Sequence, residues 1–259
     1  NTAFTKRQIG SSNTLQINPW KHVRAPLPRL DPGEAKSLYF SAGDDDRLES
    51  REAASTWNGL IGGAAGAAKA FSVSFWVRPM DSIINGSQLW AVGDLSTNGR
   101  YIETYGTTGQ IRVNWGDNGA GSLLNSYTND NVLAVGTWAH VVVTYVGGAA
   151  TAPLIYINGE YLKPSGVTTA TATTPSTISG DTLVVGGIEG GSPSTSNFTG
   201  NMCDVAVWTK ELSQAEVTEI YGAGTRTYLL GVSCNPSLLS WWRLGSDPRD
   251  DVTAAIYNQ

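Results

Sequence analysis

The sequence predicts an all-β protein, an antiparallel sandwich of two sheets with one short helix near residues 213–221. About ten short segments have the apolar residues of β-strands, and turn-forming residues separate them. Glycine occurs 30 times in the 259 residues, and charged residues make up only 15%, below the roughly 25% of an average globular protein. No series of helices alternates with the strands, which disfavours a parallel α/β sheet. We therefore expect two sheets that pack face to face.

Most of the expected strands are indicated by a period of two. In residues 110–115, the side chains of Ile111, Val113 and Trp115 share one face of the strand. Residues 71–77 alternate at first and become apolar on both faces from Phe75, which predicts burial on both sides. The threonine-rich residues 166–180 are expected to be an exposed loop or an edge strand. The other expected strands are 37–40, 88–92, 101–105, 137–145, 154–157, 161–162, 183–187, 238–244 and one that begins at residue 198.

Two local signals predict where elements begin and end. Asn158-Gly159 directly follows residues 154–157 and is the pair that most favours a two-residue β-hairpin. Ser213 and Glu216 have the spacing of a capping box, which predicts that a helix begins there. Gly222 or Gly224 is expected to end this helix.

Residues 1–36 are expected to form an extended basic arm, because four prolines interrupt the second half and no period is sustained. The first 30 residues hold five basic and no acidic side chains, whereas the whole chain has a net charge of −5. This contrast favours contact with the acidic body of the same chain or of a neighbour in an oligomer or larger assembly. The alternative is a solvated tail. The expected assembly residues are Lys6, Arg7, Trp20, Lys21, Arg24 and Arg29.

The chain is thus divided into the arm (1–36), a sandwich domain (37–224) and a C-terminal extension (225–259) with a closing strand at 238–244. Nucleic-acid binding is not expected, because five charges make a thin basic patch. Membrane insertion is not expected either, because the sequence has no run of about 18 apolar residues. The two cysteines, Cys203 and Cys234, could form one bridge or remain two buried thiols.

Four segments in this order resemble the laminin G-like branch of the concanavalin A-like lectin/glucanase superfamily, over residues 37–224. They are FSVSFWVRP (71–79), GTWAHVVVTY (136–145), LIYING (154–159) and the strand-to-helix stretch 198–216. The resemblance implies a jelly roll of two curved antiparallel sheets, often with a calcium ion at one rim. It also implies glycan or protein binding.

The segment LSWWRLGSD (239–247) resembles the strand that usually opens such domains, yet here it follows the helix. The same Trp-Trp-Arg pattern resembles structural proteins of tailed bacteriophages. The expected function is therefore that of a non-catalytic structural or decorating protein on a virion surface, which displays a lectin-like domain for assembly contacts or attachment to surface glycans. The alternative is a secreted, calcium-dependent carbohydrate-binding or adhesion module.

No enzyme is expected. Glycoside hydrolysis needs two carboxylates across the scissile bond, and Glu103 is alone on its strand. The Glu-x-Asp-x-Glu run of the related glucanases is absent from the sequence. Of the two histidines, His22 lies in the arm, and His140 is expected to be a structural histidine bonded within a sheet.

Two binding sites are expected, both without catalysis. Asp44 and Asp46 lie two residues apart in an acidic turn and could contribute oxygen ligands to calcium; the alternative is a solvated turn. Glycan binding needs aromatic faces beside polar groups; the alternative is ordinary sandwich surface or core. The candidates are Tyr101, Glu103 and Tyr105 on one strand face, Arg112 and Asn114 on a face of the next strand, and Trp115 and Asp117 at its end.

Overall fold

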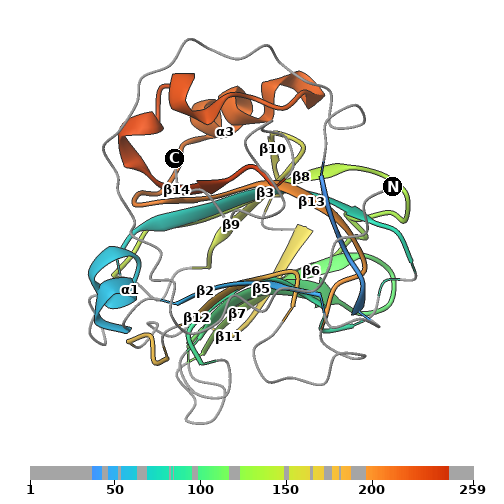
Figure 1. Ribbon diagram of the computed structural model, residues 1–259, viewed down its shortest axis with the longest axis horizontal. Helices are drawn as coiled ribbons and strands as arrows, with labels where there is room; N and C mark the ends of the chain where they lie inside the picture. Colours follow the sequence, from blue (N-terminus) through green and yellow to red (C-terminus); the bar gives the residue numbers. More distant parts are fainter. Residues whose placement is uncertain are drawn as a thin grey trace.

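The computed structural model describes residues 37–244, apart from 43–45, 52–53, 63–68, 82, 84, 95–98, 117–122, 149–151, 164–165, 172–176, 181 and 188–196. Two β-sheets lie face to face, and a group of short helices covers the outer side of one of them (Figure 1). The prediction of an all-β, two-sheet antiparallel sandwich with a short helix at 213–221 is confirmed, and the arrangement is that of a jelly roll.

The first sheet has the strand order β1-β13-β3-β8-β9-β10, and β14 also pairs with β13. The pairs are antiparallel. The strands are β1 (Leu38–Phe40), β3 (Phe71–Pro79), β8 (Ala139–Tyr145), β9 (Leu154–Ile157), β10 (Glu160–Tyr161), β13 (Gly200–Trp208) and β14 (Leu238–Trp242).

The second sheet has the order β11-β7-β6-β5-β4-β12-β2 and is also antiparallel. Its strands are β2 (Leu48–Arg51), β4 (Gln88–Val92), β5 (Arg100–Tyr105), β6 (Gln110–Gly116), β7 (Leu123–Thr128), β11 (Val167–Thr171) and β12 (Thr182–Val185). The threonine-rich segment therefore contains an edge strand, β11, which was one of the two expected alternatives.

The core between the sheets is made by the inward faces of the strands. Val73, Phe75 and Val77 of β3 are fully buried and belong to one apolar cluster with Ile102 and Val113 of the second sheet. Ser72, Ser74 and Trp76, on the other side of β3, are buried as well. Burial of β3 on both faces, predicted from its sequence, is thus confirmed, since a second layer covers the outer side of the first sheet.

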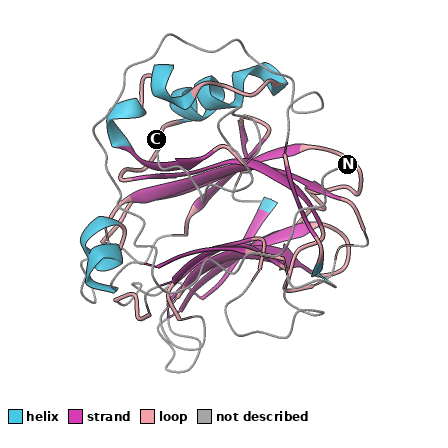
Figure 2. Ribbon diagram, viewed as in Figure 1, coloured by secondary structure: helices cyan, strands magenta, loops and turns pink. Residues whose placement is uncertain are grey.

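That second layer consists of α3 (Gln214–Tyr221) and the short helices η3 (Gly222–Gly224), η4 (Leu229–Gly231) and η5 (Asn235–Ser237) (Figure 2). Its own apolar cluster joins Val217 and Ile220 of α3 to Val142, Trp208 and Trp241 of the first sheet. The helix α1 (Ala54–Leu60) lies beside the sandwich, with Trp57 buried in the main core.

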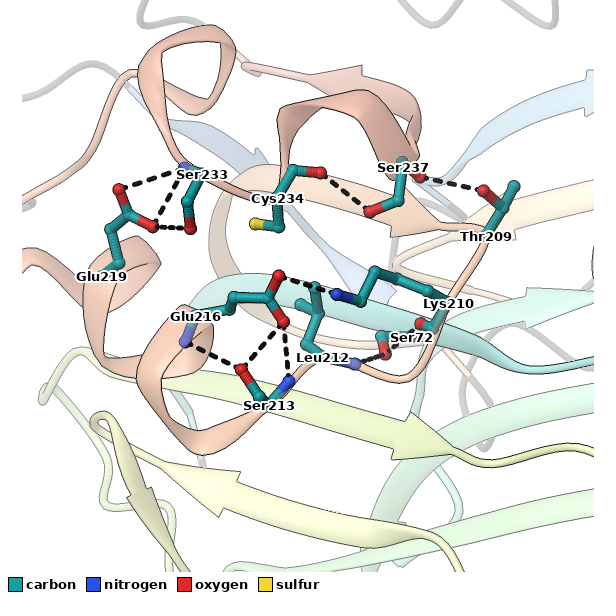
Figure 3. Close-up of polar contacts among 10 residues, drawn as sticks. All are labelled: Ser72, Thr209, Lys210, Leu212, Ser213, Glu216, Glu219, Ser233, Cys234 and Ser237. Carbon is teal, nitrogen blue, oxygen red and sulfur yellow. Dashed lines mark hydrogen bonds and ion pairs between the residues drawn. The ribbon is translucent and has the colours of Figure 1, made fainter.

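The capping box of α3 is formed as the sequence predicts (Figure 3). The backbone N–H of Glu216 donates to Ser213 Oγ at 3.4 Å, and the Ser213 N–H donates to Glu216 Oε2 at 2.9 Å. Lys210 Nζ lies 2.7 Å from Glu216 Oε1 and compensates its charge. The helix ends at Gly222, in the left-handed conformation with φ 61°.

A buried ion pair fastens the C-terminal segment to the first sheet. Asp204 lies in the β-bulge of β13, and its carboxylate contacts Arg226 Nε and accepts a 3.0 Å hydrogen bond from Trp241 Nε1. Arg226 also donates to the carbonyl of Arg243 at 3.0 Å. Cys203 and Cys234 are both buried free thiols, in different apolar clusters, so the alternative of a bridge is not realised.

Candidate functional site

The outer face of the second sheet carries a cluster of polar and aromatic side chains. We name it the outer-face cluster; it consists of Gln88, Tyr101, Glu103, Tyr105, Arg112, Asn114, Asn125 and Tyr127. Among the described residues, no helix lies over this face (Figure 1). The cluster is built on β4, β5, β6 and β7, which are adjacent in the middle of the sheet.

Strand register arranges most of these side chains in two parallel rows. Gln88, Glu103, Arg112 and Tyr127 are successive register partners across the four strands. Tyr101, Asn114 and Asn125 form the next row on the same face. Because neighbouring strands lie about 4.8 Å apart, the longer row spans about 14 Å. This is a linear, polar surface rather than a single point.

A β-bulge in β4 places Gln88 in the first row. The register shifts between Gln88 and Trp90, so Leu89 and Trp90 both enter the core while Gln88 stays opposite Glu103. A bulge re-aims side chains in this way because it adds one residue to one strand of the pair. Gln88 Nε2 then donates to Glu103 Oε2 at 2.5 Å.

Glu103 is the centre of the first row. Its Oε1 contacts the guanidinium of Arg112 through both Nε and Nη2, and its Oε2 accepts from Gln88. Burial raises the pKa of the Glu103 carboxyl, and this effect outweighs the opposite influence of Arg112 and Gln88. The guanidinium of Arg112 also lies over the ring of Tyr105, 5.1 Å from its centroid.

The second row is held by one hydrogen bond. Asn114 Nδ2 lies 2.6 Å from the Tyr101 hydroxyl oxygen, to which it donates. Burial, with a further contribution from Glu103, raises the pKa of Tyr101 to about 12, so this phenol is neutral at physiological pH. The rings of Tyr105 and Tyr127, both half-buried, are 4.7 Å apart.

Three amide oxygens of the cluster have no hydrogen-bond partner: Gln88 Oε1, Asn114 Oδ1 and Asn125 Oδ1. Gln88 is only 5% exposed and Asn114 only 2%, although both point away from the interior between the sheets. Buried polar groups in folded proteins are nearly always paired, so such exceptions require an explanation. These oxygens are therefore acceptors without a donor on the outer face of the second sheet.

The structure brings most of the expected glycan-binding residues together, but not all of them. Tyr101, Glu103, Tyr105, Arg112 and Asn114 share the outer face. Trp115 was a wrong choice: it is fully buried between the sheets, with its ring 5.2 Å from Phe71 and 6.4 Å from Trp90. The physical reason is the period of two, which points Trp115 away from Arg112 and Asn114.

Gln88, Asn125 and Tyr127 also belong to the cluster, although the sequence did not predict them. The bulge that turns Gln88 outward has no obvious sequence signal, and β7, which carries Asn125 and Tyr127, was not expected as a strand. Asp117 lies outside the described residues, as do the arm residues Lys6, Arg7, Trp20, Lys21, Arg24 and Arg29.

Calcium binding at the acidic turn stays a prediction. Asp44 lies outside the described residues. Asp46 Oδ2 accepts a 3.1 Å hydrogen bond from the Ser41 N–H, which closes the turn. In the part of the chain that the structure describes, no group of three or more His, Cys, Asp or Glu side chains could hold a metal ion.

The spacing of carboxylates on the second sheet does not fit glycoside hydrolysis. In the strands of this sheet the carboxylates are Glu103 and Glu49. The register places Glu49 three strands from β5, about 14 Å away. A retaining glycosidase needs about 5–5.5 Å and an inverting one about 6.5–9.5 Å.

Two other groups of reactive side chains are structural. In the cluster around α3, Lys210 and Ser213 are both committed to Glu216, and burial raises the pKa of the Cys234 thiol to about 12 (Figure 3). We expected His140 to be hydrogen-bonded within the sheet, but its Nδ1 has no hydrogen-bond partner. The imidazole ring instead packs between Trp76 and Tyr221.

The fold is that of a lectin-like jelly roll. Residues 49–218, more than half of the chain, match the family model of the concanavalin A-like lectin/glucanases superfamily, and the chain belongs to this family. No curated protein sequence matches it. Within the described residues there is no helix with the length and hydropathy to cross a membrane.

Several solved structures share the fold at low identity. A putative carbohydrate-binding protein from Bacteroides ovatus is 16% identical, with a TM-score of 0.55; the match covers 82% of this chain and 52% of that one, so this chain spans about half its length. Tailspike protein 2 of an Escherichia coli O157:H7 bacteriophage is 15% identical, with a TM-score of 0.55 over 86% of this chain and 29% of the tailspike. A carbohydrate-binding module of a Ruminococcus gnavus sialidase, bound to α2,3-sialyllactose, is 12% identical, with a TM-score of 0.50 over 72% of this chain and 97% of that one.

Proposed function

We propose that the protein is a non-catalytic glycan-binding module whose site is the outer-face cluster. The observation that carries this proposal is the set of buried amide oxygens without partners, those of Gln88 and Asn114 above all. They lie beside two half-buried tyrosine rings, and saccharides present both hydroxyl donors and apolar ring faces. The bacterial carbohydrate-binding structures of the same fold support the proposal.

The test is a glycan array with the purified full chain, followed by titration of the best ligand. Tyr127→Ala removes one ring of the cluster and is expected to weaken binding at least tenfold, about 1.4 kcal/mol. Tyr39→Ala is the matched control, because Tyr39 is 50% exposed on β1 of the other sheet. Equal loss in both variants, or no binding by the wild type, would refute the proposal. Repeating the titration with a chelator tests the expected calcium dependence, together with Asp44→Ala and Asp46→Ala.

The non-catalytic part of the proposal has its own test. Incubation of the protein with the bound oligosaccharide is expected to release no reducing ends, since Glu103 has no second carboxylate at hydrolytic distance on this sheet. Turnover that Glu103→Gln abolishes would show that the module is an enzyme.

We propose the surface of a virus particle as the setting of this module, with residues 1–36 as the arm that contacts neighbouring subunits. The Trp-Trp-Arg pattern at 241–243 and the shared fold of the phage tailspike support this setting. Deletion of residues 1–36 is expected to leave a folded module that no longer incorporates into particles. Unchanged incorporation would show that residues 1–36 are not needed for assembly. Secretion of the protein without any particle would favour the alternative, a free adhesion module.

A further inference from the structure

We infer that the outer-face cluster selects uncharged, hydroxyl-rich saccharides and discriminates against glycans that end in a carboxylate, such as sialylated ones. This inference rests on the proposed function and specifies the class of ligand for the same site. It follows from which groups of the cluster are already paired and which are not.

The positive charge of the cluster is already compensated. In the strands β4 to β7 the basic residues are Arg100 and Arg112. Arg100 is fully buried and is the register partner of Trp115, on the inner face of the sheet. Arg112 directs both Nε and Nη2 at Glu103 Oε1 and places the face of its guanidinium over Tyr105. A ligand carboxylate would therefore have to compete with Glu103 for the same cation.

The buried amide oxygens of the cluster that have no partner are acceptors. The orientation of Gln88 is fixed, since its Nε2 donates to Glu103 Oε2 at 2.5 Å and to the Gly86 carbonyl at 3.4 Å; its Oε1 can therefore only be the free atom. Asn114 Oδ1 and Asn125 Oδ1, in the adjacent row, are also without partners. Amide oxygens accept from hydroxyl groups, but they repel an ionised carboxylate, which can only accept.

Shape agrees with a saccharide that lies along the rows. The acceptors come from β4, β6 and β7, and Tyr105 and Tyr127 lie on the same face, in and beside the row of Glu103 and Arg112. Successive hydroxyl groups of a neutral oligosaccharide can meet these acceptors in turn. A terminal carboxylate placed beside these acceptor oxygens would be repelled by them.

The experiment compares matched pairs of oligosaccharides, each neutral glycan with its sialylated counterpart, titrated against the full chain. We expect the neutral member to bind at least tenfold more tightly. Equal affinity, or preference for the sialylated member, would overturn this inference while the proposed function stands. No binding to either member of any pair would overturn the proposed function itself.

A charge switch tests the cause. Glu103→Gln releases the guanidinium of Arg112, so the preference for neutral ligands is expected to shrink or reverse. Glu49→Gln makes the same chemical change on the same sheet, outside the cluster, and is expected to leave the preference unchanged. Equal preference in wild type and Glu103→Gln, with both folded by circular dichroism, would contradict the inference.

A second variant is independent of how Glu103→Gln folds. Asn125 is only half-buried, and Asn125→Ala removes one acceptor oxygen. The variant is expected to lower the affinity for the neutral glycan at least threefold and to change the weak affinity for the sialylated glycan by no more than twofold. Parallel losses for both ligands would count against a role for the acceptors in selection.

Discussion

His140 shows how the second layer changes the chemistry of a single side chain. Its ring is 4.9 Å from Trp76 and 5.8 Å from Tyr221, between the first sheet and α3. Burial lowers the pKa of His140 from 6.5 to about 3, because the charged imidazolium would lose its hydration there. The imidazole is thus neutral at physiological pH and packs between the rings of Trp76 and Tyr221.

This shift predicts the pH dependence of stability. Between pH 6.5 and about 3 the unfolded chain binds a proton at His140 that the folded chain excludes, so the free energy of unfolding falls as the pH falls. The slope from this one group approaches about 1.4 kcal/mol per pH unit. In His140→Phe, which keeps a ring between Trp76 and Tyr221, urea titrations at pH 4 to 7 are expected to show a flatter dependence.

The control is Val143→Ala, a buried substitution without a titratable group. It should lower stability by a similar amount at each pH and leave the slope as in the wild type. An unchanged slope in His140→Phe would show that the histidine is protonated in the folded protein.

At the scale of elements, the β9–β10 hairpin and α3 depend on each other. Asn158 and Gly159 have φ values of 52° and 82°, as a tight two-residue turn requires. Gln214 Nε2, in the first turn of α3, donates to the Gly159 carbonyl at 2.7 Å. A Cβ on Gly159 would lie 2.6 Å from Cδ1 of Tyr221, so the helix packs on the turn at a distance that only glycine permits.

A pair of glycine substitutions separates this contact from backbone strain. Gly159→Ala and Gly136→Ala both place alanine at positive φ, but a Cβ on Gly136 would have no neighbour within 4 Å. Strain costs about 1–2 kcal/mol at each position, and overpacking against Tyr221 adds about 1–3 kcal/mol at Gly159. Denaturant unfolding should therefore rank Gly159→Ala as the less stable variant; equal losses would mean that Tyr221 moves away freely.

Strands that bury apolar side chains on a period of two were predictable, and so were the capping box of α3 and the hairpin. The elements that sequence reasoning missed lack that pattern. Ser126 and Thr128 are buried where β7 would be expected to carry apolar residues, and β2 reads Leu-Glu-Ser-Arg. The helix α1 has seven residues, including Asn58 and Gly59, and depends on the burial of Trp57.

The candidate site was predictable only in part, for the same reason. Alternation within β5 and β6 identified which side chains share a face. Which strands lie beside β5 and β6 is decided by long-range pairing. The contributions of Gln88 from β4 and of Asn125 and Tyr127 from β7 could therefore not be predicted from the sequence. The period of two places Trp115 on the opposite face of β6 from Arg112 and Asn114, and in the structure Trp115 is fully buried between the sheets.

At the scale of the whole molecule, the segment after α3 is part of the sandwich. Arg226 supplies the positive charge beside buried Asp204, and β14 pairs with β13. A chain ending at Gly224 leaves the Asp204 carboxylate buried without its cation, which typically costs about 3–5 kcal/mol, and uncovers Trp208. We expect residues 1–224 to lose the cooperative thermal transition and residues 1–244 to keep it. A cooperative thermal transition of the shorter chain would show that residues 225–244 are not required for the sandwich to fold.

The strand β13 also brings the two ends of the described chain together. β1 and β14 run in the same direction along one side of it, with Leu38 opposite Met202 and Trp242 opposite Val205. Three residues of a strand span about 10 Å, so a few added residues could join Trp242 to Leu38 and make β14 and β1 one continuous border strand. A circular permutant of this kind would have its new ends between Gly147 and Gly148. It should fold to the same sandwich, because the fold depends more on which strands pair than on the order in which the chain connects them.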